Sequence, residues 1–367
     1  MLINLFSMKQ NAPLTQWQLK LYRNYRMLHG IRIAIAFVLT FLFIRFLNLP
    51  DHSWPLITLV VVMGPVSFVG NVLPRALERI AGTLAGASLG IIGLRIELYS
   101  LPLMLLWCGC AAFLCGYLTM SKRPYAALLV GITLAVVISA PAGDIQIALW
   151  RAANITIGCL LAMLFTCIFP QRAFIHWRIQ LADFLTDFSK TSAAEISHNL
   201  LNRPKISWLH GRVIGNVIKM RSLISPVNKE TRIPRSVLEE IQSITRDMVS
   251  LQHLLIKSHW SSRGSRFLIL NSATLNNIEK VTLQSLLTLA QALHTGEPAK
   301  LLVNTVQLND ITKELYHLLG YTLDGDKLES SVHSYVWLSI QMMQHLETLS
   351  NLISQALHES QFAPNNC

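Results

Sequence analysis

Acidic residues are nearly missing from the first half of this chain. Residues 1–170 hold 12 Lys and Arg but only four acids, which are Asp51, Glu78, Glu97 and Asp144. Only 14% of all 367 residues are charged, whereas a soluble domain carries about a quarter. Residues 171–367 hold 19 basic and 16 acidic side chains, an ordinary soluble balance. We therefore predict a membrane domain over 1–170 and a soluble domain over 171–367.

Signatures of catalysis and of metal binding are also missing. The sequence has no phosphate-binding glycine loop, no HExxH, no GxSxG and no clustered Cys and His ligands. Five of the six cysteines lie inside apolar runs, where Cys acts as a small apolar side chain. The basic residues flank apolar runs and form no stripe with interleaved aromatics, which argues against nucleic-acid binding. We expect no enzyme, no metal and no cofactor.

Long apolar segments fill the first 170 residues. A helix needs about 20 apolar residues to cross the hydrocarbon of a bilayer. Six segments approach this length: Ile31–Leu47, Trp54–Val72, Ala76–Ile96, Leu101–Met120, Tyr125–Ala140 and Ile147–Phe169. Prolines interrupt or end the second and the fifth. The predicted fold class is all-α, with six transmembrane helices followed by a helical bundle.

Loop charges predict the direction of insertion. With a cytoplasmic N-terminus, the inside segments carry eleven basic residues: Lys9, Lys20, Arg23, Arg26, Arg32, Arg75, Arg79, Lys122, Arg123, Arg172 and Arg178. The outside segments carry three, Arg45, Arg95 and Arg151. This positive-inside bias places both termini and residues 171–367 in the cytoplasm.

The membrane domain contains an internal repeat. A shift of 76 residues places Gly64 and Pro65 on Ala140 and Pro141, and Arg75 on Arg151. Each half holds three predicted spans, and because three is odd, the halves insert in opposite directions. A 3+3 inverted repeat of this kind is typical of transporters, whose binding sites lie where the halves meet.

Small residues recur every fourth position on one face of the third span and of the sixth. These predicted helix-packing residues are Gly82, Gly86 and Gly90, with Gly158, Ala162 and Thr166 as their counterparts. At 100° per residue, Arg75 and Arg79 lie on the same face as the glycines. Glu78 lies beside that face, within (i, i+3) reach of Arg75, and its counterpart is Asn154.

Arginine on a packed face of a membrane helix favours an anion site, because a guanidinium binds a carboxylate bidentately and stays charged. The candidate substrate-binding residues are Arg75, Arg79, Arg151, Glu78, Asn154, Pro65 and Ser67. The alternative is that Arg75 and Arg79 are orientation signals that snorkel to water. Asp51, His52 and Asp144 are candidates for a proton relay, with solvated loop residues as the alternative.

The second domain has the periodicity of amphipathic helices. We predict helices near Arg172–Ser197, Trp208–Ile224, Arg235–Trp260, Phe267–His294, Thr305–Leu319 and Ser331–His358. The predicted breaks include Ser225-Pro226, Ile233-Pro234 and the glycine at 296. Such a bundle fits a role in assembling or gating the membrane domain.

The segment Pro74–Gly90, PRALERIAGTLAGASLG, resembles the signature of the fusaric acid resistance family, which includes the aromatic acid exporters. So do the Trp54-Pro55 opening and the Arg151 segment that ends in Phe169-Pro170. The resemblance implies a six-span domain, a cytoplasmic helical domain, a Gram-negative inner membrane and export of aromatic carboxylates. It also implies kinship with plant malate channels, which are dimeric. The best-known exporters are about twice as long, so two copies of this chain would be needed to match them.

We therefore interpret the chain as a secondary exporter of organic anions in the bacterial inner membrane. Its expected partners are the lipid bilayer, the anionic substrate and a second copy of the chain. A periplasmic adaptor protein is left open. The alternatives are a passive anion channel and a membrane scaffold without transport.

Overall fold

The computed structural model describes nine stretches of the chain: residues 13–47, 53–64, 68–121, 124–139, 145–168, 171–196, 202–297, 310 and 330–360. In these stretches the secondary structure is helical, apart from an isolated parallel bridge between Phe68 and Gln171. The chain divides into two compact units, one of residues 23–172 and one in which residues 13–22 join those from 173 onward. The N-terminal residues thus lie with the second unit, although the sequence had placed them in the membrane domain.

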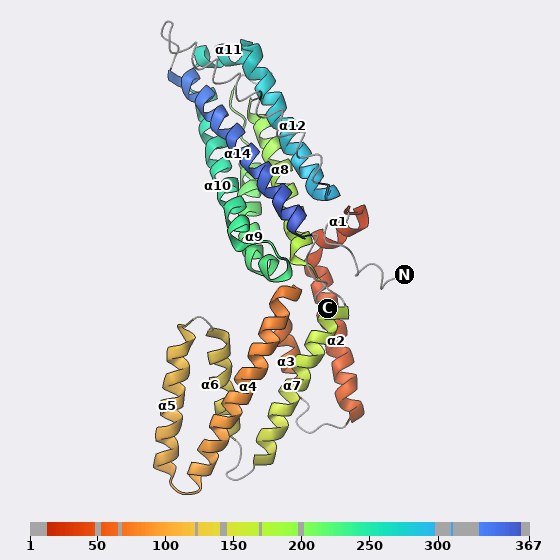
Figure 1. Cartoon of the computed structure of the whole chain (residues 1–367), viewed down its shortest axis with the longest axis vertical. Helices are drawn as coiled ribbons and strands as arrows, with labels where there is room; N and C mark the ends of the chain where they lie inside the picture. Colours follow the sequence, from red (N-terminus) through yellow and green to blue (C-terminus); the bar gives the residue numbers. More distant parts are fainter. Residues whose placement is uncertain are drawn as a thin grey trace. The chain divides into compact units, whose positions relative to one another are not determined.

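The first unit is built from apolar helices that run alternately up and down in Figure 1. They are α2 (Tyr25–Leu47), α3 (Ser53–Met63), α4 (Val69–Glu97), α5 (Leu101–Thr119), α6 (Pro124–Ile138) and α7 (Ile145–Ile168). Among the described residues, α2, α4, α5 and α7 are long and apolar enough to cross a membrane. The helices α3 and α6 are apolar but shorter, with 11 and 15 residues.

The predicted second span, Trp54–Val72, is interrupted as its proline indicated, but its C-terminal bound is wrong because α4 already begins at Val69. Its first part, α3, ends at Met63 and is about 16 Å long, about half the thickness of the hydrocarbon. Gly64 follows with φ +54°, the left-handed conformation that commonly ends helices at glycine. Val69–Val72 form the first turn of α4, which continues through Pro74 because a proline in its second turn removes only one early hydrogen bond.

Packing within the first unit has a regular pattern. The helix α4 packs along α6 and α7, while α3 packs along α7. The outer helices α2 and α5 lie against α3 and α6, respectively. The core between these helices is formed by apolar side chains: Ala36, Leu59, Val62, Met63, Val72, Ala76, Ile155, Cys159, Ala162 and Phe165.

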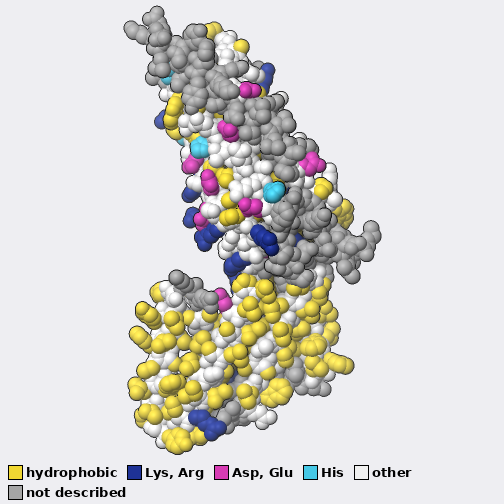
Figure 2. Space-filling view, viewed as in Figure 1, with side chains coloured by type: hydrophobic (Ala, Val, Ile, Leu, Met, Phe, Trp, Pro, Cys, Tyr) yellow, Lys and Arg dark blue, Asp and Glu magenta, His cyan; other side chains and the backbone are white. Residues whose placement is uncertain are grey.

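Large apolar side chains also cover the outside of this unit. Phe37, Phe41 and Phe46 on α2 are exposed, as are Leu106 and Phe113 on α5. Figure 2 shows one face of the first unit, and hydrophobic side chains cover this face almost continuously. An exposed apolar surface of this extent is suited to lipid rather than to water.

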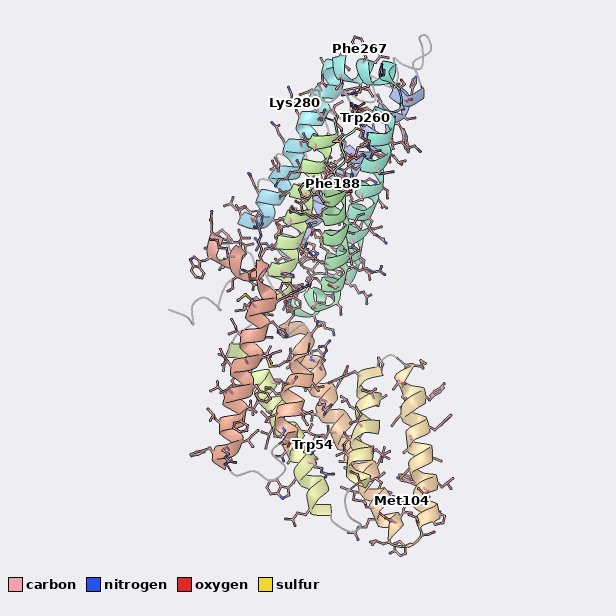
Figure 3. All side chains as sticks on the ribbon, turned by 180° about the vertical axis from the view of Figure 1, so that it is seen from behind. Trp54, Met104, Phe188, Trp260, Phe267 and Lys280 are labelled. Atoms are coloured by element: carbon pink, nitrogen blue, oxygen red, sulfur yellow. The ribbon has the colours of Figure 1, made fainter. Side chains whose placement is uncertain are left out.

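The second unit is a bundle of long helices. They are α8 (Ala173–Ile196), α9 (Ser207–Glu230), α10 (Arg235–His259), α11 (Arg263–Asn271), α12 (Ala273–Thr295) and α14 (Ser330–Ser360), with α1 (Gln16–Arg23) beginning in it. The helix α8 packs against α9, α10 and α12 and buries most of its side chains, including Phe184 and Phe188. Figure 3 shows Phe188 inside the bundle, and Phe267 and Lys280 on α11 and α12.

Two predicted boundaries in the bundle are wrong. The helix α9 continues through Pro226 because Met220, Pro226 and Val227 are all buried, so packing outweighs the cost of proline. The predicted helix Phe267–His294 is divided at Ser272, whose hydroxyl caps α12 by accepting from the amide of Leu275. The predicted break at Gly296 is confirmed, with φ +75°. The predicted helix Thr305–Leu319 lies outside the described residues except for Asp310, which is helical.

The N-terminal segment is fixed to the end of α12. The amide of Leu14 donates to the carbonyl of His294 at 2.9 Å. Arg178, which is fully buried in α8, donates from Nε to the carbonyl of Leu293 at 2.8 Å. The last carbonyls of a helix lack partners within it, and these two donors supply them. Burial lowers the pKa of Arg178 to about 10, so the guanidinium stays charged at neutral pH.

Candidate anion site

Among the charged site residues that the structure describes, Arg79 is the most deeply buried. It lies on α4 with 5% of its surface exposed, and its Nε has no hydrogen-bond partner among the described residues. Its guanidinium lies near the thiol of Cys159 on α7 and the phenol of Tyr125 at the start of α6. The charge of Arg79 therefore lies where α4, α6 and α7 come together.

Arg75 lies one turn before Arg79 and reaches the end of α3. Its Nη1 is 2.6 Å from the position that a Cβ on Gly64 would occupy. The same glycine accepts a hydrogen bond at its carbonyl from Nε2 of His29 on α2, at 3.0 Å. Two features therefore favour glycine at position 64. Its φ is positive, and a Cβ there would occupy the space that the guanidinium of Arg75 fills.

Glu78 forms no ion pair with Arg75, although the two residues lie within (i, i+3) reach. Neither Arg75 nor Arg79 forms an ion pair with an acid in the described part of the chain, and Glu78 is only half-buried. The physical reason is the direction of Arg75, whose guanidinium extends to Gly64 rather than along its own helix. Asn154, the counterpart of Glu78 in the repeat, is fully buried on α7.

Arg32 is a buried cation that the sequence reasoning missed. The loop charges predict an orientation signal at Arg32, but on α2 this residue is 4% exposed and close to His29. The signal was present in the sequence, because Arg32, Ala36, Thr40 and Ile44 recur every fourth residue and are all buried. This is the spacing that had identified the packed face of α4.

Arg151 lies at the far end of α7 and is half-buried. Its Nη1 donates to the carbonyl of Val136, in the last turn of α6, at 2.6 Å. A cation at the C-terminal end of a helix is favourable because of the helix dipole and the free carbonyls there. The pairing of Arg151 with α6 resembles that of Arg75 with α3, since each arginine reaches the end of a short helix.

The predicted helix-packing residues lie between helices of the first unit. A Cβ on Gly82, Gly86 or Gly90 would lie 2.6–2.9 Å from atoms of α6. A Cβ on Gly158 would lie 2.7 Å from the Pro55 carbonyl oxygen on α3. Ala162 and Thr166 are buried on the same helix as Gly158.

Five predicted residues lie outside the described part of the chain: Asp51, His52, Pro65, Ser67 and Asp144. The described residues contain no group of His, Cys, Asp and Glu side chains that could hold a metal ion. In the second unit, a cavity lined by Phe188, Gln252 and Tyr335 has a volume of only about 40 Å³. Such a cavity has room for little more than water. The candidate site is therefore built on the arginines of the first unit and not on this cavity.

Known proteins with similar sequences identify the family of the chain. Residues 26–309 match the Fusaric acid resistance protein family. The chain is 48% identical to "Inner membrane protein YeeA" of Escherichia coli (strain K12), over 96% of this chain and 100% of that protein. It is 26% identical to "Uncharacterized transporter YdhK" of Salmonella typhimurium, over 66% of this chain but only 37% of that protein. The E. coli K12 protein of the same name is 28% identical over 58% of this chain and 31% of its own length.

Proposed function

Because the chain belongs to the fusaric acid resistance protein family, we propose that it is a bacterial inner-membrane transporter that exports organic carboxylates, aromatic ones among them. The name of the YdhK relatives supports transport, and that of YeeA supports the inner membrane. The mechanism requires no catalytic step, because the substrate crosses the membrane unchanged.

The observation that carries the proposal is the buried charge of Arg79. An arginine inside a membrane domain costs roughly 2.5–3.5 kcal/mol or more, unless a partner offsets it. Arg75 lies one turn away, and no acid described in the structure pairs with either residue. A substrate carboxylate is the partner that fits, because it binds a guanidinium bidentately and can leave again.

The packing of the first unit supports an inverted repeat. Helix α3 packs on α7 as its counterpart α6 packs on α4, and α4 and α7 run in opposite directions. Arg75 and Arg151 occupy equivalent places at the ends of α3 and α6. In this interpretation Arg75 and Arg79 form the cytoplasmic part of the anion pathway, and Arg151 the equivalent place on the periplasmic side.

Two copies of the chain are part of the proposal. The chain covers about a third of the YdhK relatives, whose length leaves room for a second unit of each kind. We propose that this chain reaches the same arrangement as a homodimer. The molecular mass of the protein in a defined detergent or nanodisc tests this, and a monomer that transports at full rate would refute it.

The test of the function is efflux of labelled 4-hydroxybenzoate and other monocarboxylates from cells that contain equal amounts of each variant. Arg75→Ala and Arg79→Ala should each lower efflux about 10-fold to 100-fold, because a hydrogen bond to a charged group contributes about 1.5–3 kcal/mol. Arg75→Lys should also transport poorly, since lysine keeps the charge but loses the planar fork. Arg45→Ala is the matched control, because Arg45 is exposed near the end of α2.

Unchanged efflux in both alanine variants would show that Arg75 and Arg79 are orientation signals. Accumulation outside against a concentration gradient distinguishes an exporter from a passive channel. No carboxylate flux at all in the parent protein would favour a scaffold.

A further inference from the structure

Tyr125 brings a further hydrogen-bond donor to the arginines of the candidate site. It is the second residue of α6, which runs in the same direction as α4 in Figure 1. The Cβ position of Gly82 on α4 lies 3.1 Å from the Ala126 carbonyl oxygen on α6, and this contact sets the register of the two helices. One turn before Gly82, the same register places Arg79 beside Tyr125. The phenol group interacts electrostatically with both Arg79 and Arg75.

The hydroxyl hydrogen of Tyr125 lacks an acceptor. The residue is half-buried but its hydroxyl oxygen is buried, and no acceptor within the described ranges lies at hydrogen-bond distance from it. An arginine has five donors and no acceptor, so neither guanidinium can take this hydrogen. The thiol of Cys159, which is also close to the phenol group, does not accept it either. A buried donor without an acceptor lowers stability, so this hydroxyl calls for a role other than holding the fold together.

A carboxylate can accept from the hydroxyl and from the arginines at the same time. Its two oxygens together accept about four hydrogen bonds. The fork of one guanidinium uses one lone pair on each oxygen, which leaves lone pairs for a second guanidinium and for a hydroxyl. A hydroxyl that donates to a charged oxygen forms a shorter and stronger bond than one that donates to a neutral oxygen. A bound carboxylate thus supplies the acceptor that the Tyr125 hydroxyl lacks.

We propose that Tyr125 is a substrate-binding residue, whose hydroxyl donates to the carboxylate that Arg75 and Arg79 hold. This rests on the proposed function and adds a residue to the same site. The arginines supply the charge that attracts the anion, and the hydroxyl fixes the direction in which the carboxylate faces. Because the contact is with the carboxylate, it contributes equally to every monocarboxylate, whatever ring or chain follows. The hydrogen bond forms on binding and breaks on release, with no proton transfer.

The experiment compares the parent with Tyr125→Phe, which keeps the ring and removes only the hydroxyl. Full-length protein in nanodiscs is titrated by calorimetry with benzoate and with 4-hydroxybenzoate at neutral pH. Tyr125→Phe should bind both about 10-fold to 100-fold more weakly than the parent, the range for a hydrogen bond to a charged group. Benzoate has no hydroxyl on its ring, so an equal loss for both ligands assigns the contact to the carboxylate. Tyr117→Phe on α5 is the matched control and should bind like the parent, because Tyr117 is 73% exposed.

Thermal unfolding separates a role in binding from a role in the fold. Without ligand, Tyr125→Phe should unfold at no lower temperature than the parent, because a hydroxyl hydrogen without an acceptor adds no stability. The same concentration of benzoate should raise the unfolding temperature less in the variant than in the parent. Parent-like affinity in Tyr125→Phe, a loss confined to 4-hydroxybenzoate, or a ligand-free variant that is less stable than the parent would overturn the inference. If the parent binds neither carboxylate, the proposed function itself fails.

Discussion

Arg151 donates from Nη1 to the main-chain carbonyl of Val136 at 2.6 Å, and so joins the start of α7 to the last turn of α6. The helix α6 has only 15 residues, and the carbonyls of its last turn have no partner within the helix. The positive-inside rule does not explain Arg151, because this residue lies in a predicted outside segment. The hydrogen bond to Val136 gives it a structural role in addition to the place that we propose for it on the anion pathway.

Arg151→Ala should therefore lower the free energy of unfolding by about 1–2 kcal/mol, since the variant loses a charged donor at a helix end. Thermal unfolding of the purified protein in detergent measures this. Arg95→Ala is the control, because Arg95 is exposed in the last turn of α4. Equal stability of the parent and the Arg151 variant would mean that the contact with Val136 contributes nothing.

Gly86 tests the contact between α4 and α6. A Cβ there would lie 2.6 Å from the Val130 carbonyl oxygen and 2.7 Å from Cβ of Thr133. Gly86→Ala should destabilise the protein by about 1–3 kcal/mol, as overpacking commonly does. Gly109→Ala on α5 is the matched control, because nothing lies within 4 Å of its Cβ position.

Gly109→Ala should be neutral or stabilising by about 0.5–1 kcal/mol, since alanine is a better helix former than glycine. Thermal unfolding in the same detergent compares the two variants. If both behaved alike, the small residues of α4 would not form a tight helix contact.

The sequence predicted helices well where apolar length or amphipathic spacing was strong, as in α2, α5, α8 and α10. At α3 and α4 the expected interruption is present, but the boundary was wrong, because hydropathy assigned Val69–Val72 to the second span although they belong to α4. The prediction also failed at Pro226, where burial outweighs the local cost of proline. Spacing along α4 predicted Glu78 as the neighbour of Arg75, whereas the guanidinium lies beside Gly64 at the end of α3. Distances between helices decide this contact, and the sequence of one helix does not contain them.

The orientation of the spans remains a prediction from the loop charges. A reporter that is active only in the periplasm should be silent when fused after Arg172 and active when inserted near Tyr99, between α4 and α5. The physical reason is the excess of Lys and Arg in the predicted cytoplasmic segments. A periplasmic signal after Arg172 would reverse the orientation and would contradict a cytoplasmic bundle.

The bundle should lose stability as the pH falls from about 6.5 to 4, through His176. Burial in α8, and secondarily the charge of Lys219, lowers the pKa of His176 to about 4, while Asp183 opposes the shift. The imidazole also stacks on Tyr22 of α1, with ring centroids 6.5 Å apart. The unfolded chain, with an ordinary pKa near 6.5, binds the proton first, so stability is fully present above pH 6.5 and is lost below it.

The loss at pH 5 relative to pH 8 should be at most about 2 kcal/mol, which follows from these two pKa values. Hydrogen exchange of peptides from α8 in the full-length protein, corrected for intrinsic rates, measures the free energy of local opening. In His176→Gln the difference between pH 8 and pH 5 should shrink, because glutamine does not titrate. His253→Gln, at an exposed position on α10, should keep it. A parent-like pH dependence in His176→Gln would assign the effect to another group.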